Sequence, residues 1–292
     1  MVKALAVVLL VVLMGAAAQA QAPPTPETRA ALNAMLDGLV AAAKKCDAGA
    51  FAAHMSSTAF VGAFEVEGQL YVVGRDEFTE TLAGYWANGT TKAASLDDRK
   101  IQINGQVAVV SGRFRHDAST YPAPIEAEMR LLAVREGDQW KVLCAAIAVD
   151  AVPVADPNNA QVKEARATLE QWNSAFAKAD AKPLRDCISK TAFAAWVDLP
   201  LQQFTFANRE ELLGMLDQVL PSTPPQVSEI KDVQTTVLGG LAMGTMHWTL
   251  GIPDLGQIEV QVSFVLAHPE GKWEIVAAIV GPWVKPEAEP GK

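Results

Sequence analysis

The stretch Ser57-Thr58-Ala59-Phe60 returns later in the chain as Lys190-Thr191-Ala192-Phe193, which places the two phenylalanines 133 positions apart. Other residues recur in the same order and at this spacing to within one position. These pairs are Asp47 and Asp180, Arg75 and Arg209, Gly105 and Gly239, Ile125-Glu126 and Ile258-Glu259, and Trp140 and Trp273. A repeat of this length, kept in register along most of the chain, indicates two copies of one fold.

The repeat divides the chain of 292 residues into parts. We expect a first domain over 27–150, a linker over 151–159 and a second domain over 160–284. The linker is short, which favours two domains held side by side over two freely tumbling ones. Residues 285–292 are polar and rich in proline, so we expect a disordered tail there.

The first twenty residues have the pattern of a secretory signal. Lys3 supplies the positive start, an apolar run follows, and Ala18-Gln19-Ala20 has the small residues of a cleavage site. The apolar run is shorter than the roughly 20 residues that cross a bilayer. We therefore expect an exported protein, periplasmic or extracellular, with no membrane span after removal of residues 1–20.

Composition disfavours several classes of partner. The formal net charge is −9 and basic residues do not cluster, so nucleic acid is not an expected partner. No metal or other cofactor is expected, because the four histidines and three cysteines show no ligand spacing. None of Cys46, Cys144 and Cys187 recurs in both repeats, and a bridge between two of them stays open.

Each repeat begins with an amphipathic helix. Thr25 can cap the first one with Pro26 at its first position, and apolar residues then follow at helical spacing. Asp47 and Asp180 are placed to cap a short second helix, so they are read as structural residues. A strand begins near Phe60 or Phe193, and a third helix begins near Arg75 or Arg209, the latter with Asn208 as its cap.

Three extended segments close each repeat, at 106–116, 125–134 and 140–148 in the first. The middle one alternates apolar and polar residues, so one of its faces is buried. The last one is apolar on both faces after Lys141, so its outer face must be covered by a neighbouring strand, the other domain or another chain. The pattern predicts an α+β fold in which a strongly curved antiparallel sheet wraps around the long N-terminal helix.

Each repeat resembles a nuclear-transport-factor-2-like (NTF2-like, cystatin-like) domain of the SnoaL and ketosteroid-isomerase type. The resemblance is carried by the helix that ends at Asp47 or Asp180, by the Thr-Ala-Phe turns, by the helix starts at Gly74-Arg75-Asp76-Glu77 and Asn208-Arg209-Glu210-Glu211, and by the closing strands at Trp140 and Trp273. It implies a cavity between sheet and helices, and domains that often pair through the outer sheet face. Family members include isomerases, cyclases, dehydratases and proteins that only bind.

The resemblance also implies where an isomerase would hold its proton-transfer groups. In this chain those places hold Leu39 and Trp172 on the opening helix, Ala63 and Trp196 on the first strand, and Leu131 and Phe264 on the middle sheet strand. Apolar side chains cannot act as acid or base, so isomerase-type proton transfer is disfavoured in both repeats.

Other residues could replace the missing groups. Glu65 and Asp198 match each other on the first strand, and Asp198 could serve as general base in the C-terminal cavity with His247 assisting. The simpler interpretation of Asp198 is a solvated carboxylate at the cavity rim. Arg113 matches His247 and could orient an anionic ligand, although a surface-facing strand position explains it better.

The leading hypothesis is an exported, non-catalytic tandem domain whose cavities bind a small apolar molecule or whose paired sheets bind a protein partner. The residues predicted to line its site are Trp172, Trp196, Asp198, Phe264, Leu39, Glu65 and Arg113. Because the second repeat holds five of the seven tryptophans, we expect the site in the C-terminal half. The partner that binds through the sheet faces could also be a second copy of the chain. Two alternatives remain. One is a SnoaL-like isomerase, lyase or hydrolase that uses Asp198, and the other is a purely structural pseudo-dimer.

Overall fold

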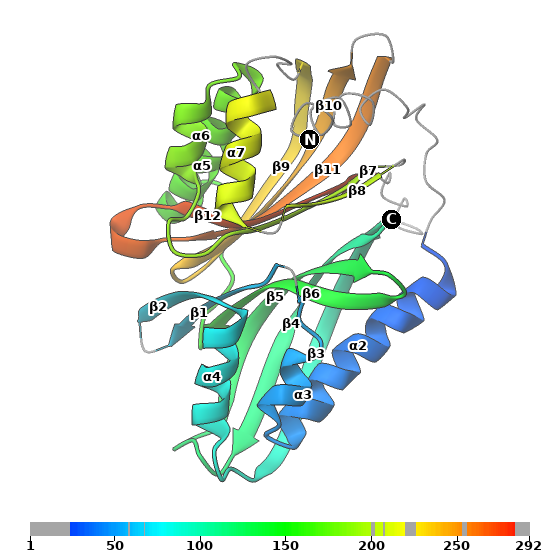
Figure 1. Cartoon of the computed structure of the whole chain (residues 1–292). Coiled ribbons are helices and arrows are strands. Elements are labelled where there is room, and N and C mark those ends of the chain that lie inside the picture. The colour runs from blue at the N-terminus through cyan, green and yellow to red at the C-terminus, as the bar shows by residue number, and fades with distance from the viewer. Residues whose placement is uncertain are drawn as a thin grey trace, which may run out of the picture.

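The computed structural model of the chain describes residues 24–57, 59–66, 68–199, 202–206, 208–219, 226–252 and 256–283. The predicted signal at 1–20 and the predicted disordered tail at 285–292 lie outside the described residues. Figure 1 shows two similar lobes, each with a sheet and a group of helices, stacked so that the two sheets face each other. We call the lobe from α2 to β6 domain 1 and the lobe from α5 to β12 domain 2.

Domain 1 consists of three helices and six strands. The helices are α2 (Pro26–Lys44), α3 (Ala48–Ala52) and α4 (Arg75–Trp86). The strands are β1 (Val61–Val66), β2 (Gln69–Gly74), β3 (Thr91–Asn104), β4 (Val107–Ala118), β5 (Ile125–Glu136) and β6 (Gln139–Val149). They form one sheet in the order β2-β1-β6-β5-β4-β3.

Domain 2 repeats this arrangement element by element. The helices are α5 (Ala160–Ala177), α6 (Ala181–Cys187) and α7 (Arg209–Val219), with a short 3-10 turn η1 (Pro269–Gly271). The strands are β7 (Ala194–Leu199), β8 (Gln202–Phe206), β9 (Gln226–Leu238), β10 (Leu241–Ile252), β11 (Gly256–Ala267) and β12 (Glu274–Pro282). The sheet order is β8-β7-β12-β11-β10-β9.

The α+β fold is confirmed, with two differences from the expected sheet. The first strand of each domain pairs parallel with the last one, β1 with β6 and β7 with β12, whereas the other neighbouring strands pair antiparallel. Each domain also has two strands that the sequence pattern did not indicate, β2 and β3 in domain 1 and β8 and β9 in domain 2. The result is a larger, twisted sheet with helices on one face only (Figure 1).

The predicted helix caps are confirmed by hydrogen bonds. The backbone N–H of Thr28 donates to the Thr25 side chain at the start of α2. The Asp47 carboxylate accepts from Ala50 N at 2.8 Å, and Asp180 accepts from Lys182 N at 3.2 Å. Each aspartate satisfies a backbone donor that has no partner within its helix, which explains why it recurs in both repeats.

The duplication is also visible in the backbone conformation. Cys46 and Ala179 both end the opening helix with a positive φ, of 50° and 54°. Asp98 and Asp232 also have positive φ, of 51° and 52°, and lie within the matching strands β3 and β9. Residues other than glycine rarely adopt this left-handed conformation. Their matched occurrence shows which residues of the two domains correspond.

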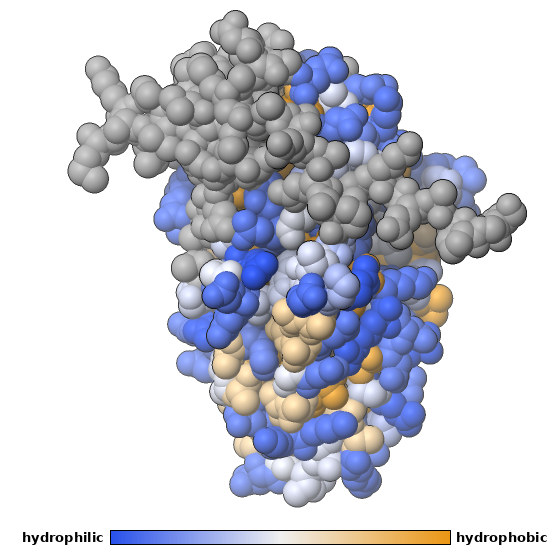
Figure 2. All heavy atoms as spheres, turned by 90° about the vertical axis from the view of Figure 1, so that its right-hand side faces the viewer, coloured by the Kyte–Doolittle hydropathy of each residue, from blue (hydrophilic) through white to orange (hydrophobic). Residues whose placement is uncertain are grey.

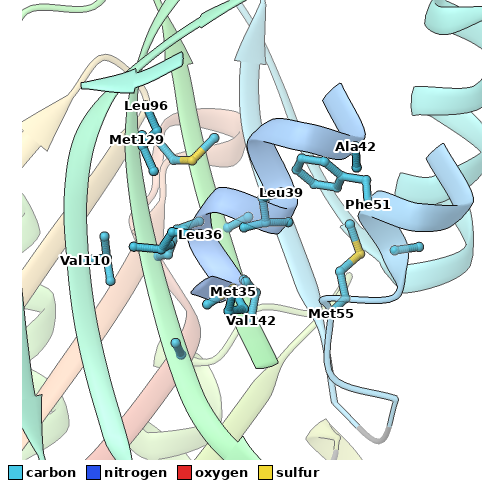
Figure 3. Packing of buried hydrophobic residues seen from close by; sticks show 14 of the residues in the cluster. Met35, Leu36, Leu39, Ala42, Phe51, Met55, Leu96, Val110, Met129 and Val142 are labelled. Carbon is cyan, nitrogen blue, oxygen red and sulfur yellow. The ribbon is translucent and has the colours of Figure 1, made fainter. Parts of the chain in front are cut away.

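Each domain has its own core between the helices and the inner sheet face. In domain 1, Leu36 and Leu39 of α2 point toward the sheet residues Val110 and Val142 (Figure 3). In domain 2, Leu169 and Trp172 of α5 belong to a matching cluster on the other sheet. The apolar stripe of each opening helix is therefore buried as the helical spacing predicted.

A third apolar cluster lies between the two sheets. Domain 1 contributes Val61, Ala63, Val107, Leu132, Val134, Leu143, Cys144 and Ala146, and domain 2 contributes Ala194, Trp196, Leu241, Met243, Val265, Val276, Ala277 and Ile279. The outer face of the last strand is thus covered by the other domain, which was one of the three predicted possibilities. The surface seen in Figure 2 is mostly hydrophilic where residues are described, with a narrower apolar strip on domain 1.

Candidate functional site

The positions that correspond to the proton-transfer groups of isomerases are buried and apolar. Leu39 and Leu131 belong to the core of domain 1. Trp172 and Phe264 belong to the core of domain 2, where their rings meet edge to face with centroids 6.3 Å apart. These aromatic rings fill the space between α5 and the sheet, so they act as core residues in the structure.

Trp196 and Ala63 do not face the cavity of their own domain. Both lie in the cluster between the two sheets, whereas the neighbouring residue Ala195 faces the domain 2 core. The expectation that Trp196 and Trp172 line one cavity is therefore wrong. Successive residues of a strand point to opposite faces, and the strand carries Trp196 on its outer face.

Asp198 is on the same outer face and is only 2% exposed. Its Oδ2 accepts a hydrogen bond from the backbone N–H of Gln106, at the β3–β4 turn of domain 1, at 2.7 Å. Burial raises the pKa of this carboxyl, and the hydrogen bond from Gln106 partly opposes that shift. The interpretation of Asp198 as a solvated carboxylate at a cavity rim is therefore wrong.

Glu65 plays the corresponding part in domain 1. Its Oε2 accepts a hydrogen bond from the backbone N–H of Gly240, at the β9–β10 turn of domain 2, at 2.5 Å. The turn allows this approach because Gly239 has φ of 60°, and a Cβ there would lie 2.2 Å from Glu65 Oε2. The two carboxylates thus join the domains, each holding a turn of the other one.

Arg113 and His247 occupy matching strand positions but differ in environment. The Arg113 side chain is 57% exposed and its Nε lies 3.4 Å from Glu128 Oε1, so it forms a surface ion pair. His247 is 6% exposed and its ring stacks on Trp283 at 4.0 Å, with Nε2 3.7 Å from Glu259 Oε1. The predicted site residues are therefore divided among two cores, the interdomain layer and the surface.

A pocket of about 490 Å³ lies between α5 and β9 in domain 2. It is lined by Arg166, Glu170, Asn173, Ser174, Ala177, Glu229, Ile230 and Val233. Asn173 is 6% exposed, and its Nδ2 donates to the thioether of Met246 at 3.2 Å. Its Oδ1 has no hydrogen-bond partner among the residues that the structure describes. A buried acceptor without a partner costs about 1–3 kcal/mol, so this amide needs an explanation.

Asn173 was missed as a site residue, although the sequence contains a signal for it. It follows Trp172 on the buried face of α5, which otherwise presents Val162, Ala165 and Leu169 to the core. A polar residue at such a position is costly unless it has a partner, which makes it a candidate for recognition.

The corresponding place in domain 1 holds an ion pair. Asn173 corresponds to Val40, and Val233 corresponds to Arg99. Arg99 Nη1 lies 2.7 Å from Asp37 Oδ1 on α2, and Arg99 Nε donates to the backbone carbonyl of Leu96 at 2.9 Å. The arginine therefore connects β3 to α2 at the position where domain 2 has its pocket. The two repeats have diverged at this site.

A second cleft, of about 600 Å³, lies between the domains. The cleft is lined by Ser56, Ser57, Ala59, Phe60 and residues 74–77 of domain 1 and by residues 190–193 and 208–210 of domain 2. These are the segments by which the repeat is recognised, so their recurrence reflects a shared structural position. Arg75 Nη2 donates to Ala52 O at 3.1 Å, and Arg209 Nη1 lies 3.1 Å from Glu210 Oε1. Both guanidinium groups thus have bonds within their own domain.

Other kinds of site are not found in the described part of the chain. It contains no group of three or more histidine, cysteine, aspartate or glutamate residues that could hold a metal ion. Its three cysteines, all described, are free thiols. No helix in the described ranges is long and apolar enough to cross a membrane.

The two domains with this sheet order and helix arrangement define a tandem α+β protein of the NTF2-like type. The family model of the SnoaL-like domain matches the chain twice, over residues 32–145 and 165–278. The chain therefore belongs to the SnoaL-like domain family, with one copy of the family domain in each half. A comparison with curated proteins gave no match.

Solved structures of single NTF2-like proteins are similar to parts of the chain. An NTF2-like protein of unknown function from Silicibacter pomeroyi is 17% identical and covers 42% of this chain and 96% of its own, with a TM-score of 0.35. An NTF2-like protein of unknown function from Pseudomonas putida is 13% identical over 44% and 97%, with a TM-score of 0.38. A cystatin-like fold protein from Burkholderia xenovorans is 16% identical over 47% and 99%, with a TM-score of 0.37.

Proposed function

We propose that this chain is a non-catalytic binding protein whose domain 2 holds a small molecule in the pocket between α5 and β9. The observation that carries the proposal is the difference between the two repeats. Domain 2 leaves a pocket of about 490 Å³ lined by the buried Asn173, where domain 1 has the Arg99–Asp37 ion pair. Ligand sites are typically concave with apolar walls and a few polar groups, and Ala177, Ile230 and Val233 supply the apolar part of this pocket beside its polar and charged residues.

The placement of the carboxylates supports a non-catalytic function. A general base must come within hydrogen-bond reach of the proton that it removes. Asp198 is buried between the sheets and bonded to Gln106, and it does not line either cleft described above. The residues at the family's proton-transfer positions are apolar. The enzymatic alternative based on Asp198 therefore has no geometric support.

Two further parts of the proposal concern location and partners. Export remains a prediction from residues 1–20, which lie outside the described residues. A protein partner or second copy bound through the outer sheet faces is disfavoured over the part of each face that packs against the other domain. The proposed ligand is accordingly a small molecule with an apolar body.

Thermal unfolding with a library of small metabolites tests the proposal. A ligand that binds only the native state stabilises it, by about 2.7 kcal/mol at a concentration one hundred times its Kd. The control is a closed variant, Glu170→Asp with Val233→Arg, which copies the ion pair of domain 1. We expect compounds that raise the Tm of the native chain and leave that of the closed variant unchanged.

The same experiment can contradict the proposal. Compounds that shift the Tm of both proteins equally would place binding elsewhere, and a library without any hit would argue against a small-molecule function. The closed variant must first show the same unliganded Tm and circular dichroism spectrum as the native chain, so that loss of binding reports the pocket.

A further inference from the structure

The His247 ring lies flat against the indole of Trp283, the residue that directly follows β12. The two ring centroids are 4.0 Å apart and the ring planes differ by 5°. The backbone N–H of Trp283 also donates to the backbone carbonyl of Glu259 at 3.2 Å. The stack and this hydrogen bond together fasten Trp283 to strands β10 and β11.

Domain 1 makes the same backbone connection without a ring stack. Asp150 corresponds to Trp283, and its N–H donates to the carbonyl of Glu126 at 3.0 Å. Arg113 stands at the position of His247. The shared fold therefore needs the backbone hydrogen bond but not the stack. At this position domain 2 has replaced a side chain that is always charged by one of the type that changes its charge near neutral pH.

One ring nitrogen of His247 is left without a hydrogen bond. Its Nε2 is buried and has no partner among the residues that the structure describes, and Glu259 Oε1 lies 3.7 Å away. Gln261, which faces His247 across the strands, already accepts a hydrogen bond from Gln102 at 2.6 Å. A protonated imidazole carries an N–H on both nitrogens. A proton on His247 would therefore place a donor on Nε2 beside the Glu259 carboxylate.

We propose that the His247–Trp283 stack is a pH-dependent latch, which holds Trp283 on the sheet more tightly in acid than in base. An imidazolium stacked on an indole gains a cation–π attraction that exists only while Trp283 is docked. The Glu259 carboxylate balances the charge beneath the indole and so lowers the cost of burying it. Docking of Trp283 therefore takes up a proton, and it is favoured as the pH falls.

The other charged groups near the ring leave this sign unchanged. Lys231 of β9 faces His247 across the strands, and its ammonium lies 2.6 Å from Glu229 Oε2. In domain 1, Lys100 stands on the outer face of β3. Among these groups Glu259 is the one that lies within 4 Å of the ring nitrogen. A proton on the ring therefore meets a carboxylate before it meets an ammonium group.

Amide hydrogen exchange of the full chain, followed by NMR between pH 5 and pH 8, tests the latch. The protection factor of the Trp283 N–H, corrected for the intrinsic pH dependence of exchange, reports the docked state directly. We expect it to be about fivefold higher at pH 5 than at pH 8, the size of one cation–π contact. The Asp150 N–H is the internal control, because it makes the matching bond in domain 1 without a histidine, and its protection should stay constant.

Two variants assign the effect to the named groups. His247→Gln should abolish the gain in protection, and Glu259→Gln, which keeps the backbone acceptor of Trp283, should reduce it. Equal protection of Trp283 at both pH values, an equal gain at Asp150, or an undiminished gain in either variant would each overturn the proposal. If a variant fails to fold, the native chain decides, because the midpoint of the change at Trp283 must coincide with the titration of the His247 ring signals.

Discussion

Glu65 of domain 1 accepts a hydrogen bond from the backbone N–H of Gly240 in domain 2 at 2.5 Å. The duplicated residue Asp198 accepts one from Gln106 of domain 1 at 2.7 Å. The relationship is reciprocal, because each carboxylate holds the hairpin turn of the domain to which it does not belong. We call this pair of contacts the interdomain clamps. They explain why an acidic residue recurs at this strand position although neither copy faces a cavity.

Removal of the Glu65 carboxylate should destabilise the chain. Glu65→Ala leaves the Gly240 N–H without its acceptor and should lower the free energy of unfolding by about 1–3 kcal/mol. Glu65→Gln keeps an acceptor of similar length and should recover most of the loss. Urea unfolding followed by tryptophan fluorescence measures both. Equal stability of the alanine and native chains would show that the clamp does not contribute.

The clamp at Asp198 should make stability depend on pH. Burial raises the folded-state pKa of this carboxyl above its ordinary value of 3.8. A raised pKa means that its contribution to stability is fully present below the unfolded value and is lost as pH rises through the folded value. Asp198→Asn keeps an acceptor for Gln106 and removes the buried charge. Relative to the native chain, this variant should therefore gain stability as pH rises above about 4.

Unfolding free energies of the native chain and Asp198→Asn, measured from acid to neutral pH, test this sign. A variant that loses stability relative to the native chain over that interval would show that the Gln106 hydrogen bond to the charged form outweighs burial. Asp198→Ala serves as the control, because it removes both the charge and the acceptor.

The two domains should stay together after the linker is cut. The apolar cluster between the sheets, the interdomain clamps and the hydrogen bond from Gln102 Nε2 to Gln261 Oε1 at 2.6 Å do not depend on chain continuity. A protease site introduced between Asp156 and Asn158 should give two fragments that co-elute in size-exclusion chromatography. Trp196→Ala should weaken that association, since truncation of a buried tryptophan costs about 3–5 kcal/mol. Separate elution of the fragments of the otherwise native chain would contradict the interface.

The three thiols should differ in reactivity. Burial raises the pKa of Cys187 to about 11 and that of the fully buried Cys144 higher still. Cys46 is partly exposed, with Sγ 3.1 Å from Thr91 Oγ1. Because the thiolate is the reactive form, a thiol reagent such as DTNB should label Cys46 first and the other two only after denaturation. Rapid labelling of Cys144 in the native chain would show that the layer between the sheets opens.

The domain architecture could be predicted from the sequence because the repeat is long and its marker residues have local functions. Asp47 and Asp180 are helix caps whose role depends on residues two or three positions away. The covered outer face of the last strand could be predicted for the same reason. The apolar or polar character of each face is read from neighbouring residues of one strand. The strands β3 and β9 escaped notice because charged residues and a left-handed aspartate, Asp98 or Asp232, interrupt their alternation.

The candidate site was harder to predict because its geometry depends on contacts between distant segments. The clamps join residues that are 175 and 92 positions apart, and nothing near Glu65 or Asp198 in the sequence indicates the partner turns. The sequence interpretation placed Trp196 on the inner face of β7, whereas the side chain lies on the outer face. A shift of one residue moves every side chain of a strand to the opposite face. The pocket at Asn173 depends on a residue that is distant in the sequence. In domain 1, Arg99 forms an ion pair from β3 to α2, whereas Val233 at the matching position of domain 2 cannot form one.

Native mass spectrometry of the chain purified from its own host tests the central claim most directly. We expect one small molecule per chain, lost in the closed variant Glu170→Asp with Val233→Arg and retained in Glu65→Gln. A bound molecule that survives in the closed variant, or a chain that carries none and turns over a substrate instead, would contradict the account.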